Sequence, residues 1–183
     1  YQFKAPHRPW DPAPSYADYL KDVTIPHPST FNDDYKGRKA AKEAWMRIDG
    51  HMNRKDVKIK PPEGLSDDEL IAWNKFGNED GEFWTPDERM SDEARKNWKF
   101  QRYIKDYLRC VKAADDAIGE MLNYLDASGL SENTIVVYTS DQGFYLGEHG
   151  WFDKRFMYEE SMHMPLLIRY PNMIQPGLVT DEM

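Results

Sequence analysis

Residues 134–165 read TIVVYTSDQGFYLGEHGWFDKRFMYEESMHMP, and this stretch decides the fold that the sequence predicts. It begins with an unbroken apolar and β-branched run at residues 134–139, which is too short for an independent helix and is bounded by turn-forming residues. Such a run predicts a strand that is buried on both faces of a sheet. A polar loop containing Gly147 and Gly150 follows the strand. In open α/β sheets ligands bind outside the carboxyl ends of the strands, so we expect the chemistry in this loop.

A long amphipathic helix is predicted directly before the strand. Apolar residues recur at spacings of three and four between residues 91 and 127, which predicts one continuous apolar stripe. Gly129 suits the left-handed position after a helix, and Leu130 supplies the closing hydrophobic contact. Helix, tight turn and buried strand form half of a right-handed crossover unit. Residues 164–170, MPLLIRY, predict a second strand, so the fold class is α/β.

The first half of the chain is less regular. Residues 1–14 contain four prolines and predict an extended or turning segment, because proline excludes a helix there. In this segment His7 lies near Trp10, between two prolines. The rigid turn either holds the imidazole in place for a chemical role or leaves it as a solvated loop residue.

Residues 15–90 predict an irregular region with short helices. They are expected at residues 15–21, 34–48 and 65–76, the last capped by Ser66. Residues 77–86 read as a loop, and residues 55–62, KDVKIKPP, as a solvated connection. We expect His27 and His51 on the surface, because neither has a partner at metal-ligand spacing.

Size and composition limit the function classes. The 183 residues are enough for one domain or a piece of one. The net charge of -8 argues against nucleic-acid binding. Cys110 is the single cysteine, so it forms no internal disulfide and predicts a packed core thiol. No apolar run is long enough to span a membrane, and no signal peptide is present. Because the chain starts at Tyr1 rather than Met, we expect both ends to be cuts, with any targeting signal outside.

Two oxygen donors follow the predicted strand of residues 134–139. Asp141 and Gln142 carry a carboxylate and an amide oxygen, which suit Ca²⁺ or Mg²⁺ rather than zinc or copper. Ca²⁺ takes about six to eight oxygens, so the remaining ligands must come from elsewhere. The alternative is a turn in which Asp141 caps a backbone amide.

Cationic and titratable side chains follow in the same loop. Lys154 can hold an oxyanion beside a divalent cation as a mobile point charge, or it is a surface salt-bridge residue. Arg155 can do the same, or it can pair with Glu159. His149 is either an acid or base near neutral pH or a residue that fixes the loop by hydrogen bonding. Glu160 and His163 are either a pair of metal ligands or residues that pack against the next strand.

Several short motifs follow one another in a specific order: KAPHRP at residues 4–9, the helix end Leu-x-x-Ser-Gly-Leu, NTIVVYTSDQG at residues 133–143, LGEHG at residues 146–150, and Lys154. This order closely resembles the type I sulfatases of the alkaline phosphatase superfamily. Residues 34–38, DYKGR, look like bacterial carbohydrate sulfatases. The resemblance implies an α/β/α sandwich around a largely parallel mixed sheet, of which residues 1–183 are an internal portion of a single catalytic domain. It also implies hydrolysis of sulfate esters.

The resemblance also implies roles for individual residues. Asp141 and Gln142 would be ligands of Ca²⁺, with Mg²⁺ as the alternative, although the family usually has Asn or His in the second place. Lys154 would contact the sulfate, and His7 would bind sulfate or protonate the leaving oxygen. His149 and Arg155 would be further substrate contacts.

Part of the family's active site is absent from these 183 residues. The family's nucleophile is a formylglycine made from the first residue of Cys/Ser-x-Pro-x-Arg, and neither this motif nor the early Asp-Asp metal ligands occur here. Cys110 is not that nucleophile, because Val-Lys-Ala follows it on a helix. We expect the nucleophile upstream, in the remainder of the sulfatase domain, and the fragment alone to be inactive.

The expected substrate is a sulfated carbohydrate, with N-acetylglucosamine-6-sulfate as the resemblance suggests, hydrolysed by a periplasmic or secreted enzyme. Two alternatives remain open. One is a phosphodiesterase or phosphonate hydrolase of the same superfamily, which would share metal and fold. The other is a non-catalytic module that binds acidic glycans through the same loop.

Overall fold

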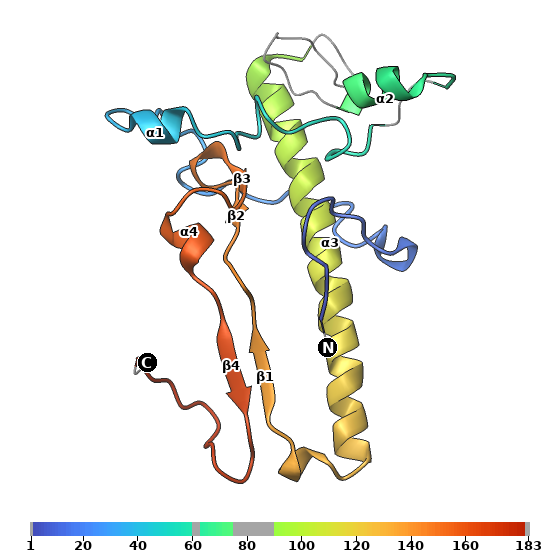
Figure 1. Cartoon of the computed structure of the whole chain (residues 1–183), viewed down its shortest axis with the longest axis vertical. Helices are drawn as coiled ribbons and strands as arrows, with labels where there is room; N and C mark the ends of the chain where they lie inside the picture. Colours follow the sequence, from blue (N-terminus) through green and yellow to red (C-terminus); the bar gives the residue numbers. More distant parts are fainter. Residues whose placement is uncertain (1, 60–62, 75–89, 182–183) are drawn as a thin grey trace.

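A computed structural model describes residues 2–59, 63–74 and 90–181 of the chain (Figure 1). A long helix, α3 (Asp92–Ala127), runs along one side of the molecule. A narrow ribbon of two strands lies at the end of the molecule where this helix ends (Figure 1). The elements in chain order are η1 (Pro14–Tyr16), α1 (Lys39–Lys42), α2 (Asp67–Asn74), α3 (Asp92–Ala127), η2 (Ser131–Asn133), β1 (Val136–Thr139), β2 (Tyr145–Leu146), η3 (Glu148–Gly150), β3 (Phe152–Asp153), α4 (Glu159–Met162) and β4 (Leu166–Arg169).

The helix α3 confirms the prediction for residues 91–127. Ser91 is its N-cap, and the Ser91 side chain accepts a hydrogen bond from the Ala94 amide at 3.2 Å, which satisfies a backbone donor of the first turn. At the other end Gly129 has a φ of 67°, and the Leu130 amide donates to the Leu125 carbonyl at 3.0 Å. This is the left-handed ending that Gly129 and Leu130 predicted.

Burial along α3 is uneven, which corrects the predicted continuous stripe. The fully buried positions, Cys110 among them, all lie between Lys99 and Cys110. Farther along the helix Val111 is exposed and Tyr124 is 66% exposed. The apolar spacing predicted which side of the helix could be covered, but it did not predict that full burial would stop at Cys110. Burial raises the pKa of the Cys110 thiol to about 11, as expected for a packed core thiol.

The predicted strands both form, but their surroundings differ from the prediction. β1 pairs with β4 in antiparallel register, from Val136 opposite Arg169 to Thr139 opposite Leu166. Within the described residues both two-stranded sheets are antiparallel, so the largely parallel sheet is not seen there. Burial of β1 on both faces is wrong for this chain, because Val137 is 54% exposed and the whole of β4 is exposed. An apolar run shows that a strand needs covering surfaces, but it does not say which segments provide them.

Trp10 is the centre of the larger core. Its side chain is completely buried, and its ring lies 4.5 Å from that of Tyr103 on α3 and 6.2 Å from those of Phe144 and Phe152. Phe152 belongs to β3, and Phe144 directly precedes β2. The N-terminal segment, which is extended or turning as predicted, is therefore anchored by Trp10 to both the helix and the β2–β3 hairpin.

The irregular region contains less helix than its pattern indicated. Within residues 65–76 the helix α2 covers Asp67–Asn74, and residues 75 and 76 lie outside the described part. At its start Ser66 N donates to Glu69 Oε2 at 2.8 Å, and Glu69 N donates to Ser66 Oγ at 3.4 Å. This is a capping box and confirms the predicted start. Residues 34–48 form only the short α1, and residues 15–21 only η1 followed by turns. The loop expected at residues 77–86 lies outside the described residues.

Two predictions of simple surface segments are wrong. In the run KDVKIKPP, of which residues 60–62 lie outside the described part, Asp56 and Val57 are buried. His51 is half-buried: its Nδ1 accepts a hydrogen bond from the Arg47 amide at 3.0 Å, and its ring lies 4.2 Å from that of Trp45. His27 is exposed, as expected. Local polarity predicted solvation, but long-range packing, which a short window does not contain, buried these side chains.

We expect Trp10→Ala to lower the free energy of unfolding by about 3–5 kcal/mol, because truncation of a buried aromatic leaves a cavity in the core. Denaturant-induced unfolding of the protein measures this change. Trp45→Ala is the matched control, because Trp45 is 58% exposed and its loss should cost about 1 kcal/mol or less. Equal effects of the two substitutions would contradict the central position of Trp10.

The stability of the protein should depend on pH through His51. Burial, with a smaller contribution from Arg47, lowers the pKa of His51 to about 4, below its ordinary value of about 6.5. The unfolded chain then binds this proton more readily, so the stabilisation present above pH 6.5 is lost as the pH falls towards 4. Urea unfolding at pH 7.5 and pH 5 should show a larger loss in the wild type than in His51→Gln.

The control for this measurement is His163→Gln, since the His163 side chain is exposed. This variant should keep the pH dependence of the wild type. If His51→Gln and the wild type lose the same stability between the two pH values, His51 is not the responsible group.

Candidate functional site

The loop after β1 forms a compact hairpin with a tight turn. β2 and β3 pair antiparallel, with Tyr145 opposite Asp153. In the turn Gly147 has a φ of 111°, and a Cβ added there would lie 2.6 Å from the Phe100 ring. Gly150 has a φ of 68°. The LGEHG sequence therefore needs glycine at both places, because both residues have a positive φ. Gly147 must also be glycine because it approaches α3 closely.

Asp141 and Gln142 lie just beyond the end of β1. Ser140 stabilises this turn, with its hydroxyl donating to the Gln142 carbonyl at 2.8 Å and accepting from the Gln142 amide at 3.4 Å. The alternative in which Asp141 caps the turn is thus not observed. Among the described residues neither the Asp141 carboxylate nor the Gln142 side-chain amide has a hydrogen-bond partner, so both oxygens are free to bind a ligand.

These two oxygens fit one part of a hard-cation site. The described residues contain no group of three or more His, Cys, Asp or Glu side chains placed to hold a metal ion. Since Ca²⁺ takes about six to eight oxygens, Asp141 and Gln142 can supply only a minority of the ligands. Their residue types suit Ca²⁺ or Mg²⁺.

Ser161 of α4 holds the strand end and the Lys154 segment together. Its carbonyl accepts a hydrogen bond from the Gly143 amide at 2.8 Å, and its hydroxyl donates to the Lys154 carbonyl at 2.9 Å. The Lys154 ammonium lies 6.0 Å from the centroid of the Phe144 ring. Among the described residues it has no carboxylate partner, so the surface salt-bridge alternative is not observed. The structure therefore brings Lys154 close to the loop that carries Gln142.

His7 is exposed on the N-terminal segment, and its ring is oriented by the backbone. Nδ1 of His7 lies 2.6 Å from the carbonyl oxygen of Arg8. Because a carbonyl only accepts, Nδ1 carries the hydrogen in this contact, and Nε2 is left for a ligand. Arg8 Nη1 lies 3.8 Å from Asp153, which directly precedes Lys154. The His7 and Lys154 segments are thus neighbours.

Arg155 does not make the contact that its spacing allowed. Its guanidinium pairs with Asp153 at 3.0 Å, while Glu159 lies 3.6 Å from His163. The alternative pairing of Arg155 with Glu159 is therefore wrong, and Glu160 lies 3.5 Å from His149. Asp153, which sequence analysis did not select, lies between two arginines, Arg8 and Arg155.

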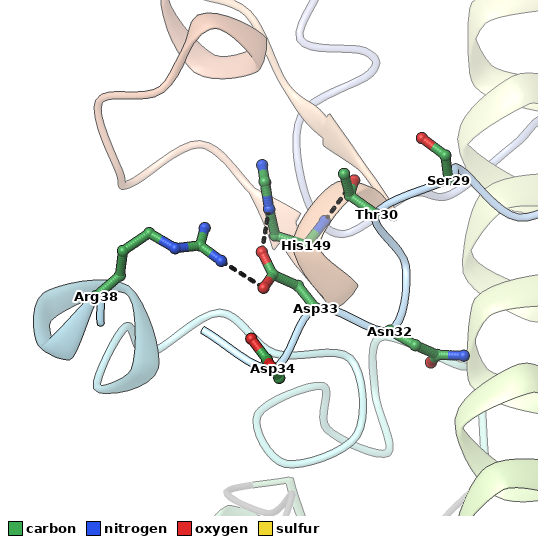
Figure 2. Close-up of a pocket in the computed structure, with 7 residues that line it drawn as sticks. All are labelled: Ser29, Thr30, Asn32, Asp33, Asp34, Arg38 and His149. Atoms are coloured by element: carbon green, nitrogen blue, oxygen red, sulfur yellow. Dashed lines mark hydrogen bonds and ion pairs between the residues drawn. The ribbon is translucent and has the colours of Figure 1, made fainter. Parts of the chain in front are cut away.

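His149, which lies in the hairpin turn, lines a polar pocket (Figure 2). The pocket has a volume of about 430 Å³ and is lined by Ser29, Thr30, Asn32, Asp33, Asp34, Arg38 and His149. His149 Nδ1 lies 2.6 Å from Asp33, as the dashed line in Figure 2 shows, and Nε2 lies 3.5 Å from Glu160. The backbone amide of His149 donates to Thr30 at 3.1 Å. With both ring nitrogens engaged, the geometry favours loop fixing over acid-base chemistry for His149.

Asp33 is the fixed negative charge of this pocket. Arg38 donates to it at 2.5 Å, and this hydrogen bond, above all other contacts, holds the pKa of the Asp33 carboxyl well below its usual range. Sequence analysis missed Asp33. The signal next to it was residues 34–38, DYKGR, whose likeness to carbohydrate sulfatases pointed to this segment.

Comparison with protein families decides the identity of the chain. The family model described as Sulfatase matches residues 1–183. The chain belongs to the sulfatase family. This confirms the family resemblance read from the ordered motifs.

Individual sulfatases resemble the chain over different lengths. The N-acetylglucosamine-6-O-sulfatase of Bacteroides thetaiotaomicron is 44% identical over 193 aligned residues, which cover 97% of this chain and 35% of that protein. An ulvan-active sulfatase of Formosa agariphila is 41% identical over 48% of this chain and 17% of its own length. Human iduronate 2-sulfatase is 38% identical over 39% of the chain and 13% of its own length. The chain spans about a third or less of the length of these relatives.

A solved structure supports the fold. A protein in complex with its substrate D-glucosamine-2-N,6-O-disulfate matches with a TM-score of 0.72 at 39% identity, over 95% of this chain and 38% of that chain. The sulfatase chain therefore shares the α/β fold of this relative. Among its described residues, no helix, α3 included, combines the length and apolarity needed to cross a membrane.

Gly143→Ala should disturb the sulfatase loop, because an added Cβ would lie 2.2 Å from the Glu160 carbonyl oxygen. Such overpacking against backbone costs about 1–3 kcal/mol of folding free energy. Gly119→Ala is the control, since nothing lies within 4 Å of its Cβ position on α3 and alanine should add about 0.5–1 kcal/mol there. Thermal unfolding measures both, and a neutral Gly143→Ala would contradict the close packing of α4 on this loop.

Proposed function

We propose that the sulfatase to which these residues contribute hydrolyses sulfate esters of carbohydrates, with 6-O-sulfated N-acetylglucosamine as its substrate. The observation that carries this proposal is the 44% identity to an N-acetylglucosamine-6-O-sulfatase over 97% of the chain. The structural relative bound to a 6-O-sulfated glucosamine supports the same substrate class. The α/β/α sandwich around a mixed sheet is proposed for the complete domain, where β1 and β4 would be covered.

Lys154 is proposed to bind the sulfate group. Sulfate transfer develops charge on the peripheral oxygens of the sulfur, and a preorganised cation stabilises that charge. The Lys154 ammonium suits this role because no carboxylate of the described residues neutralises it and because it lies near Phe144, beside the loop with Gln142. Arg155 and His149 are proposed as outer contacts, both already held by carboxylates.

His7 is proposed to protonate the leaving oxygen. When the bond between sulfur and the ester oxygen breaks, the electron pair stays on that oxygen, and the Nε2 proton of an imidazolium converts it to the alcohol. Water supplies the oxygen that ends in sulfate, so the products are the sugar alcohol and sulfate. The Nδ1 contact with the Arg8 carbonyl supports this role, because it leaves Nε2 as the exchanging nitrogen.

Asp141 and Gln142 would hold a Ca²⁺, or alternatively Mg²⁺, together with ligands from outside these residues. The ion would neutralise sulfate oxygens, and a formylglycine upstream would supply the nucleophile, as is typical of the family. A sulfated-glycan substrate is in keeping with a periplasmic or secreted enzyme, which we propose as its location.

Lys154→Ala in the complete enzyme should lower kcat/KM for N-acetylglucosamine-6-sulfate by about 10²–10³-fold, the usual loss when one preorganised group at the developing charge is removed. Sulfate release from the sugar ester measures it. Lys39→Ala is the control, since its exposed ammonium only approaches Glu43 at 3.9 Å. A wild-type rate for Lys154→Ala would remove Lys154 from the site.

The same assay distinguishes the competing reaction. Matched sulfate and phosphate esters of the same sugar should be hydrolysed at very different rates, in favour of the sulfate. Faster hydrolysis of the phosphate ester would replace the proposal with a phosphoesterase of the same superfamily.

A further inference from the structure

We propose that Asp56 is a positioning residue for His7 and that it acts through Arg8. The inference rests on the proposed sulfatase reaction, in which His7 protonates the leaving oxygen. Asp56 lies in the segment that local polarity assigned to solvent, and its side chain is only 3% exposed. A buried carboxylate outside the catalytic loop therefore orients the acid of the reaction.

Asp56 binds the Arg8 side chain through both of its carboxylate oxygens. Arg8 Nε donates to Oδ1 at 2.6 Å, and Arg8 Nη2 donates to Oδ2. This bidentate geometry is available to arginine but not to lysine. Asp56 is itself fixed, because its Oδ2 also accepts from the Asn53 amide at 2.9 Å and its own amide donates to the Asn53 side chain at 3.0 Å.

The guanidinium of Arg8 is confined on two further sides. It lies 5.1 Å from the centroid of the Phe152 ring, and Nη1 lies 3.8 Å from Asp153. Phe152 is part of the buried core around Trp10. Arg8 is therefore held between the buried Asp56 on one side and the hairpin on the other, although its side chain is still 26% exposed.

Because Arg8 is held in place, its backbone carbonyl can orient the His7 ring. The Arg8 carbonyl accepts from His7 Nδ1 at 2.6 Å, and the His7 amide donates to the Lys4 carbonyl at 2.8 Å. The side chain of Arg8 thus holds the peptide unit whose oxygen selects the tautomer and the ring orientation of His7. If Asp56 released Arg8, this carbonyl would move and the Nε2 proton would lose its direction.

The test is a double-mutant cycle in the complete enzyme, measured as kcat on N-acetylglucosamine-6-sulfate. Asp56→Asn is nearly isosteric, but it replaces an anionic acceptor by an amide that donates, and it should lower kcat by about 10–100-fold, part of the usual contribution of general acid catalysis. In a His7→Ala background the same change should alter kcat by less than about 3-fold, because the group it positions is gone. An equal loss in both backgrounds, or no loss in either, would overturn the proposal.

Two further variants separate positioning from general destabilisation. Asp126→Asn is the matched control, since it also removes a carboxylate paired with an arginine, Arg169 at 3.0 Å, but in the last turn of α3. It should leave kcat unchanged. If Asp56→Asn fails to fold, Arg8→Lys keeps the charge and the backbone carbonyl while losing the bidentate grip, and it should show the same dependence on His7.

The tautomer of His7 gives a readout that does not need turnover. ¹⁵N NMR of histidine-labelled protein, with the His7 signal assigned by His7→Ala, should show hydrogen on Nδ1 in the wild type and a mixture of tautomers in Asp56→Asn. An unchanged tautomer in the variant would refute the positioning role even if its sulfate release is lower than that of the wild type. If the wild-type enzyme releases no sulfate but Asp56→Asn changes the tautomer of His7, the proposed function is refuted and the geometric inference stands.

Discussion

Burial of the Trp10 side chain between α3 and the β2–β3 hairpin is the interaction on which the rest of the site depends. The Trp10 ring contacts Tyr103 on the helix and Phe152 on the hairpin. His7 and Lys154 lie only a few residues from Trp10 and Phe152 along the chain, so this aromatic contact brings their backbones together. Two segments almost 150 residues apart in sequence thereby reach one side of the hairpin.

The polar contacts around this core join neighbouring segments and restrict individual side chains. Ser161 bonds both Gly143 and Lys154 through its own carbonyl and hydroxyl, and His149 is held between Asp33 and Glu160. Such contacts need a dry or partly dry surrounding, because exposed ion pairs contribute little. The aromatic core therefore positions the segments, and the hydrogen bonds around it orient the individual side chains.

The ribbon of β1 and β4 shows where the described chain leaves apolar surface uncovered. Ile135, Leu166, Leu167 and Ile168 are all exposed large hydrophobic residues. A two-stranded ribbon is marginal in stability by itself, so its partners must lie outside the segments that pack in the core around Trp10. Just beyond the end of β1, the side-chain oxygens of Asp141 and Gln142 likewise have no hydrogen-bond partner among the described residues.

Several features were predictable because they depend on neighbours in sequence. The start of α3 at Ser91, its end at Gly129 and the capping box of α2 follow from contacts over three to five residues. Both strands coincide with short apolar runs. The sulfatase family was also predictable, because the order of its short motifs is specific even where each motif alone is weak. Asp141, Gln142 and Lys154 were selected in this way.

Only the tertiary structure decided which of these residues meet. Nothing local distinguishes Asp56 in a lysine-rich run from a solvated carboxylate, yet it is buried against Arg8, 48 positions away. Arg155 had an acidic neighbour at helical spacing and instead pairs with Asp153, because the backbone there is a strand end and not a helix. The sequence by itself determined the local elements and the family, since both are encoded over short distances. The burial of charges and the pairing of distant segments were decided by the fold, since they depend on contacts that no local window contains.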